Sequence, residues 1–121
     1  MTYAISLPAG PIAGRDMIEL AQQCERWGYT EAWLAEVAGP DAFTVAGALA
    51  VTTTQRIGTA VVPIYNRTPM VLAMSAATLT QLSEGRFVLG LGTSSETIVS
   101  RWNGTPFARP LTRMRETMTS V

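Results

Sequence analysis

Four short apolar segments recur along the chain and constrain its fold more than any other feature. Their centres lie roughly 28 residues apart, a period typical of supersecondary repeats, and they span residues 3–7, 31–35, 56–62 and 86–91. Each segment is nearly continuously apolar rather than alternating, which is typical of strands that are covered on both faces. The pattern therefore predicts four buried strands of a parallel sheet.

Helical patterns separate these segments. They span about residues 15–27, 41–53 and 69–83, and a fourth begins near Leu111. Asp41 and Thr68 are residue types that cap helix N-termini, and each precedes a helical segment. Gly28 and Gly85 follow the first and third helical segments, where glycine commonly ends a helix.

The alternation of strand and helix predicts an α/β fold built from βα units with right-handed crossovers. Two architectures fit this alternation: an open doubly wound sheet, or part of a (β/α)8 TIM barrel. Even spacing, short helices and a first βα loop that is not glycine-rich favour the barrel. Four units make half a barrel, so we expect residues 1–121 to form a single domain that is the N-terminal half of a barrel and a fragment of it. The open edges of such a half-barrel need a second half or another copy of the chain to cover them.

Composition excludes several classes of function. The 121 residues carry no formal net charge, and the nine basic residues are all arginine, with neither lysine nor histidine. Histidine triads, histidine metal sites and Schiff-base lysines are therefore excluded within this sequence, and we expect no metal. The dispersed charge argues against nucleic acid as a partner. The single Cys24 cannot form an internal disulfide, and no apolar run is long enough to cross a bilayer, so we expect a cytoplasmic protein.

Candidate site residues follow the predicted strands, because the loops after the strands build the active face of a βα barrel. Glu36 directly follows the second strand. Its carboxylate is a candidate for orienting a substrate or for acid–base catalysis. It is equally a candidate for capping the next helix or pairing with an arginine, and both interpretations stay open.

Two further loops contain polar groups in similar positions. Asn66, Arg67 and Thr68 precede the third helix and suit an anion or a polar ring edge, with simple helix capping by Thr68 as the alternative. The loop of residues 92–110 is long enough to favour a function. Its glycine and hydroxyl residues allow close backbone approach to a ligand or a plain tight turn; they are Gly92, Thr93 and Ser94.

The three tryptophans receive different interpretations. Trp27 and Trp33 fall in core-like patterns, so we expect both to pack in the interior. Trp102 lies in the long loop and is a candidate for covering a ligand.

Two motifs carry a resemblance to a known family. They are Arg56-Ile57-Gly58-Thr59-Ala60-Val61-Val62-Pro63 with Arg67-Thr68-Pro69, and Leu79-Thr80-Gln81-Leu82-Ser83-Glu84-Gly85-Arg86-Phe87-Val88-Leu89-Gly90-Leu91-Gly92. They resemble the bacterial luciferase-like monooxygenase superfamily. Within it the chain is most similar to the coenzyme F-420-dependent oxidoreductases related to methylenetetrahydromethanopterin reductase. The resemblance covers essentially the whole chain, and the Leu-Ser-x-Gly-Arg-Phe run into Gly-Leu-Gly is its most specific part.

The resemblance implies a barrel whose C-terminal face binds coenzyme F-420 or, alternatively, FMN, and an enzyme that transfers a hydride to or from a small organic substrate. It implies a bulge in the third strand with a non-prolyl cis peptide bond at Ala60–Val61 behind the cofactor ring. It also places further residues in the cofactor and substrate pocket, with Glu36 as the catalytic candidate; they are Asn66, Gly92, Thr93 and Ser94.

The chain also departs from the family pattern. Many relatives carry a histidine or aspartate near Glu36, and the phosphate-binding loops of later strands are absent from this sequence. Two other functions therefore remain: a non-catalytic truncated half-barrel that associates with itself, and an FMN-dependent luciferase-like monooxygenase. The expected partners are a small-molecule substrate and either a second copy or a C-terminal half-barrel, without nucleic acid or membrane.

Overall fold

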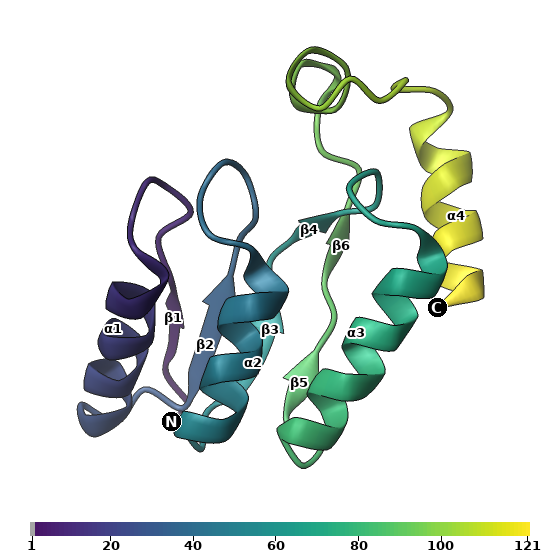
Figure 1. The fold of residues 1–121 in the computed structure, drawn as a ribbon. Helices are drawn as coiled ribbons and strands as arrows, with labels where there is room; N and C mark the ends of the chain where they lie inside the picture. Colours follow the sequence, from purple (N-terminus) through teal and green to yellow (C-terminus); the bar gives the residue numbers. More distant parts are fainter. Residues whose placement is uncertain (1) are drawn as a thin grey trace.

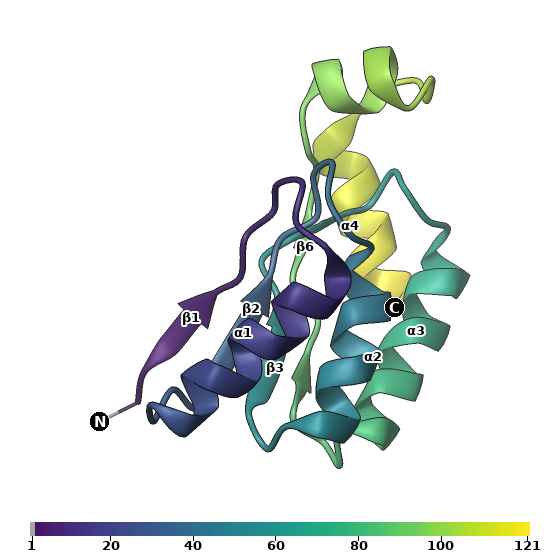
Figure 2. The same ribbon diagram turned by 60° about the vertical axis from the view of Figure 1, so that its left-hand side comes forward.

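The structure, a computed structural model, describes residues 2–121 and consists of a parallel sheet with helices along one face (Figure 1). In chain order the elements are β1 (Ala4–Ser6), α1 (Gly14–Arg26), β2 (Glu31–Leu34), α2 (Ala42–Thr52), β3 (Arg56–Thr59), β4 (Val62–Pro63), α3 (Pro69–Leu82), β5 (Phe87–Val88), β6 (Leu91–Gly92), the π-helix η1 (Thr97–Trp102) and α4 (Pro110–Ser120). The loops that follow the strands all lie at one end of the sheet, as both views show (Figure 1, Figure 2).

The strand order confirms the barrel-type architecture. The larger sheet has the order β1-β2-β3-β5 and every neighbouring pair is parallel, with Ala4 beside Glu31 and Glu31 beside Arg56. The order follows the chain without reversal, whereas a doubly wound sheet reverses its order at a switch point. The described residues therefore form an α/β fold that corresponds to part of a barrel.

The third and fourth apolar segments, residues 56–62 and 86–91, are each divided between two short strands. The division of the third is the bulge that the resemblance implies, whereas the sequence does not predict the division of the fourth. A second, two-stranded parallel sheet pairs β4 with β6, and its first partners are Val62 and Leu91. The strands break here because the Thr59 hydroxyl makes hydrogen bonds to the backbone N–H and carbonyl of Gly90. These bonds stand where the regular pairing of the two strands would continue. The bulge in the third strand is confirmed, and the Ala60–Val61 peptide bond is cis.

The helix boundaries confirm the capping predictions. Asp41 accepts a hydrogen bond from the Thr44 backbone N–H at 2.7 Å, and Thr68 accepts one from Val71 at 3.3 Å. Gly28 and Gly85 follow α1 and α3 with φ angles of +90° and +83°, a conformation that favours glycine. These local signals explain why the helices begin and end where the sequence indicates.

Two apolar clusters form the core. The larger lies between the sheet and the helices and includes Leu34, Leu49, Ile57 and Leu72, each at most 1% exposed. The smaller lies beneath the long loop and is made of Ile64, Tyr65 and Val99. The second cluster anchors η1, so the long loop has a packed base of its own.

The tryptophans divide between core and surface. The Trp33 ring packs on Gly58, where an added Cβ would overlap the ring, so its predicted packing role is confirmed. The prediction for Trp27 is wrong: it follows the last turn of α1, beyond the buried face, and is 67% exposed. Trp102 is exposed at the end of η1, a helix that the sequence pattern does not predict.

No helix among residues 2–121 combines the length and apolar character that a membrane crossing needs.

Candidate functional site

A cavity of about 300 Å³ opens where the second, third and fourth strands end. Its lining comes from the loop after β2, the break between β3 and β4, β4 itself, the loop after β6 and η1. The lining residues are Ala35, Glu36, Val37, Ala60, Val61, Pro63, Ser94, Ser95 and Ile98. The structure therefore brings four of the predicted site residues together: Glu36, Ala60, Val61 and Ser94. The cis peptide bond joins two of the lining residues.

Gly92 and Thr93 do not line this cavity, although Gly92 lies against one of its lining residues. Gly92 is paired with Pro63, and an added Cβ would lie 2.5 Å from Cγ2 of Val61. Glycine at this position therefore leaves room for the Val61 side chain. Thr93 connects Gly92 to Ser94, and Ser94 has a φ angle of +60°, which is uncommon outside glycine and typical of functional loops.

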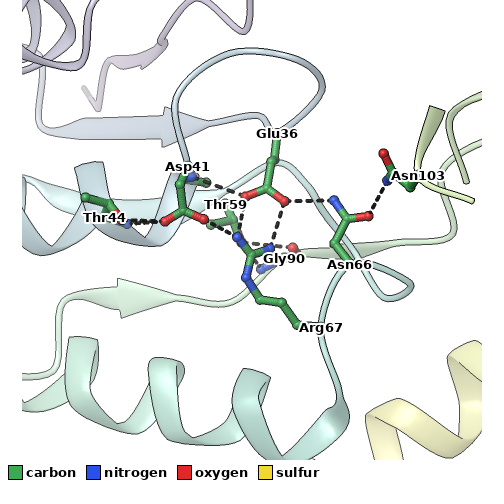
Figure 3. Close-up of polar contacts among 9 residues, drawn as sticks. Glu36, Asp41, Thr44, Thr59, Asn66, Arg67, Gly90 and Asn103 are labelled. Atoms are coloured by element: carbon green, nitrogen blue, oxygen red, sulfur yellow. Dashed lines mark hydrogen bonds and ion pairs between the residues drawn. The ribbon is translucent and has the colours of Figure 1, made fainter. Parts of the chain in front are cut away.

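Glu36 makes both contacts expected of a structural role: it pairs with an arginine and caps the next helix (Figure 3). Arg67 donates to it through Nη1 to Oε1 at 2.7 Å and through Nη2 to Oε2 at 2.8 Å, a bidentate pair. The Ala42 backbone N–H donates to Oε2 at 3.2 Å, so Glu36 also caps the start of α2. A catalytic role of Glu36 stays a prediction.

Arg67 joins three elements around the cavity. Its guanidinium also pairs with the carboxylate of Asp41 and lies over the ring of Phe43, 4.8 Å from the ring centre. The positive charge of Arg67 is therefore neutralised by carboxylates of the chain itself. Thr68, the next residue, caps α3. Arg67 is thus already paired with two carboxylates, and an anion site at residues 66–68 stays a prediction.

The pKa values of both carboxylates follow from these contacts. Burial disfavours the charged form of Glu36 and raises its pKa, but hydrogen bonds from Arg67, Asn66 and the Ala42 backbone outweigh burial and hold the pKa below 4.5. The pKa of Asp41 is lowered in the same way, where burial is outweighed by Thr44 and Arg67. At neutral pH Glu36 is an ionised acceptor and a poor proton donor.

Asn66 lies outside the cavity lining, and both ends of its amide are occupied. Its Nδ2 donates to Oε1 of Glu36 at 3.1 Å, and its Oδ1 accepts from Nδ2 of Asn103 at 2.9 Å (Figure 3). Asn103 is not among the residues predicted from the sequence. No local motif marks it, because it depends on the long loop folding back onto residues 63–68.

The residues that line the cavity fit a flat ring with a polar edge. Ala60, Val61 and Ile98 offer apolar surface, whereas Glu36 and Ser94 offer polar atoms. A volume of about 300 Å³ is near the lower end of small-molecule pockets. It therefore suits one ring system rather than a whole nucleotide-like cofactor. Residues 2–121 contain no group of three or more acidic, cysteine or histidine side chains arranged to hold a metal ion.

Solved structures share this fold closely. The coenzyme F-420-dependent tetrahydromethanopterin reductase of Methanopyrus kandleri matches with a TM-score of 0.84 and 23% identity over 97% of this chain and 38% of its own. The oxygenating component of 3,6-diketocamphane monooxygenase of Pseudomonas putida, solved with FMN, matches with a TM-score of 0.84 and 21% identity over 98% of this chain and 38% of its own. The described fold is thus part of a TIM barrel.

Sequence comparison identifies the family. Residues 1–121 match the family described as luciferase-like monooxygenase, and the chain belongs to that family. A Mycobacterium tuberculosis protein assigned as a coenzyme F-420-dependent oxidoreductase is 41% identical over 99 residues, which cover 81% of this chain and 28% of the relative. The 5,10-methylenetetrahydromethanopterin reductase of Methanolobus tindarius is 27% identical over 100% of this chain and 37% of its own length. The chain spans about a third of the length of these relatives. It is a member of a family of enzymes.

Proposed function

We propose that this chain is the cofactor-facing part of a coenzyme F-420-dependent oxidoreductase, which transfers a hydride between that deazaflavin and a small organic substrate. The observation that carries the proposal is the cavity that Ala60 and Val61 line beside Glu36 and Ser94. The 41% identity to a relative assigned as F-420-dependent supports the choice of this cofactor over FMN.

Residues in and beside the cavity have distinct roles in this proposal. Ala60 and Val61 support one face of the ring, and Gly92 keeps the room that the Val61 side chain needs. The hydroxyl of Ser94 and the backbone of Thr93 bind its polar edge. When bound, coenzyme F-420 supplies the hydride chemistry.

Glu36 is the proposed catalytic residue, and its state limits what it can do. Its ionised carboxylate, held by Arg67, is suited to orienting a donor group of the substrate. It is not suited to giving up a proton at neutral pH, so any general acid must be a group other than Glu36.

The remainder of the barrel is part of the proposal. β1 and β5 are the outer strands of the described sheet, and their outer backbone groups suit further parallel strands. We propose that a C-terminal half-barrel, or a second copy of the chain in a homo-oligomer, covers these edges and seats the anionic tail of the cofactor. A cytoplasmic location belongs to the same proposal.

A titration tests the cofactor. The chain, completed by its C-terminal half-barrel, is titrated with coenzyme F-420 and with FMN, and fluorescence reports binding. Ser94→Gly removes the hydroxyl but keeps the left-handed backbone accessible, and we expect it to weaken F-420 binding about 2- to 10-fold. Met118→Ala, on the exposed surface of α4, serves as the control. Failure of the completed barrel to bind either compound would refute the proposal.

An FMN-dependent monooxygenase is the second candidate. It is favoured by the family match and by a relative from Escherichia coli, named luciferase-like monooxygenase, that is 38% identical over 62% of this chain and 24% of its own length. The mass and absorbance spectrum of the chromophore that copurifies with the protein separate the two cofactors.

A non-catalytic half-barrel that associates with itself is the third candidate. The open strands β1 and β5 favour it, because unpaired parallel edges attract further strands. Light scattering of residues 1–121 tests it, and a well-folded monomer would contradict it.

A further inference from the structure

Two hydrogen bonds in series connect the Glu36 carboxylate to the loop that follows β6. Asn66 donates to Oε1 of Glu36 at 3.1 Å and accepts from Asn103 at 2.9 Å (Figure 3). Asn103 is the residue that ends η1. The series therefore links the carboxylate wall of the cavity to the helix on its other side.

The loop that carries Asn103 forms one wall of the cavity. Ser94, Ser95 and Ile98 line it from this loop, whereas Glu36 and Val37 line it from the loop after β2. Val99 anchors the middle of η1 in the apolar cluster with Ile64 and Tyr65. Asn103 holds its far end, so the distance between the two walls depends on both attachments.

The charge of Glu36 sets the direction of this series. An ionised carboxylate only accepts hydrogen bonds, so Asn66 must turn its Nδ2 group toward Glu36. The Oδ1 atom of Asn66 then faces Asn103 and requires a donor there. Asparagine supplies that donor, whereas aspartate, which has the same shape, does not.

We propose that Asn103 is a positioning residue, which acts through Asn66. It holds the cavity wall formed by Ser94, Ser95 and Ile98 at the correct distance from Glu36. Asn103 and Asn66 are both exposed and neither lines the cavity, so neither needs to touch a ligand to have this effect. Only the cofactor-affinity readout below rests on the proposed function.

Hydrogen exchange of the full chain, followed by mass spectrometry, tests the positioning role without any cofactor. We expect Asn103→Ala and Asn103→Asp to accelerate exchange in Thr97–Trp102 about 2- to 10-fold, the effect of one hydrogen bond. Thr105→Ala removes a hydroxyl from the same loop without touching the series and is expected to leave exchange unchanged. Unchanged exchange in α1 shows that each variant is folded. The proposal is overturned if Asn103→Asp exchanges like the wild type. It is also overturned if Thr105→Ala accelerates exchange in Thr97–Trp102 as much as Asn103→Asp does.

A double-mutant cycle tests the direction of the series. In Glu36→Gln the side chain at position 36 can donate, so Asn66 can turn and offer its Nδ2 group to an aspartate at position 103. We therefore expect Asn103→Asp to accelerate exchange less in the Glu36→Gln background than in the wild type. An equal or larger acceleration in that background would overturn the directional argument.

Cofactor affinity supplies the second readout, measured in the completed barrel with coenzyme F-420. We expect Asn103→Ala to raise the Kd about 2- to 10-fold and Thr105→Ala to leave it unchanged. If the wild type binds no F-420 while the exchange results hold, the proposed function fails and the positioning role stands. If F-420 binds but Asn103→Ala leaves both exchange and Kd unchanged, the positioning role fails alone.

Discussion

The Thr59 hydroxyl satisfies both backbone polar groups of Gly90. It accepts from the Gly90 N–H and donates to the Gly90 carbonyl oxygen, each at 2.8 Å. The same carbonyl accepts from the Val62 N–H at 3.0 Å, and Thr59 is only 1% exposed. One side chain thus joins the two short sheets at the point where the regular strand pairing stops, directly below the cavity that contains Ala60 and Val61.

Thr59→Val tests this joint. Valine has the same shape but no hydroxyl, so the Gly90 N–H loses its partner in a partly buried site. We expect a loss of about 1–3 kcal/mol in the free energy of unfolding, measured by urea denaturation. Thr59→Ser keeps the hydroxyl and is expected to lose less. A loss in Thr59→Ser without a loss in Thr59→Val would show that the methyl group, not the hydroxyl, carries the stabilisation.

Gly90→Ala tests the same joint from the other side. An added Cβ would overlap the Thr59 carbonyl oxygen, so the two backbones must move apart, and we expect a loss of about 2–4 kcal/mol. Gly47→Ala in α2 is the matched control, because its Cβ would lie at an ordinary 3.9 Å from Leu79. Alanine is the better helix former, so this control is expected to gain about 0.5–1 kcal/mol. Comparable losses at both positions would contradict the steric argument.

Local chemistry explains which parts of the fold are predictable from the sequence. Asp41, Thr68, Gly28 and Gly85 act within a few residues of their own position, and the helix boundaries follow from them. The break in the fourth strand is different, because an apolar run looks the same whether its strand is continuous or split. It depends on a bond between residues 31 positions apart, from Thr59 to Gly90.

The site also combines residues that the sequence indicates with contacts that depend on residues far apart in the chain. The rule that active loops follow the strands indicates Glu36 and Ser94, and the family resemblance adds Ala60 and Val61. The structure places all four at one cavity. That rule does not choose between a free carboxylate and a paired one. The choice for Glu36 depends on Arg67, which lies 31 residues further along the chain and whose role is defined only once both loops have folded.

Arg86→Ala tests the role of the arginine in the Gly-Arg-Phe motif. Its guanidinium donates to the carbonyl oxygens of Gln55 at 2.5 Å and Ala50 at 2.9 Å, so it stabilises the C-terminal turn of α2. We expect a loss of about 2 kcal/mol in the free energy of unfolding, because charged donors make the stronger hydrogen bonds. Arg101→Ala, an exposed arginine in η1, is the control and is expected to change stability by less than about 0.5 kcal/mol. A similar loss in both variants would argue for a general effect of charge.

The pH dependence of stability tests the state of Glu36. Its pKa in the folded protein lies below the ordinary value of 4.5, because hydrogen bonds from Arg67, Asn66 and the Ala42 backbone outweigh the opposing effect of burial. A lowered pKa means that the folded protein binds this proton less readily than the unfolded chain does. The resulting stabilisation is fully present above pH 4.5 and is lost as the pH falls through the folded pKa.

Glu36→Gln removes this contribution. At pH 7 we expect the variant to unfold with a free energy about 3 kcal/mol lower than the wild type, because Arg67 then lacks its bidentate partner in a largely buried site. As the pH falls below 4.5 the wild type loses its advantage, so the two free energies converge. Asp41 has a lowered pKa as well, and Asp41→Asn is expected to show the same convergence, starting from its ordinary value of 3.8. Urea denaturation at a series of pH values measures both differences. Parallel curves for wild type and Glu36→Gln would mean that Glu36 does not titrate differently in the folded protein, and would contradict the stabilising effect of its pairing with Arg67.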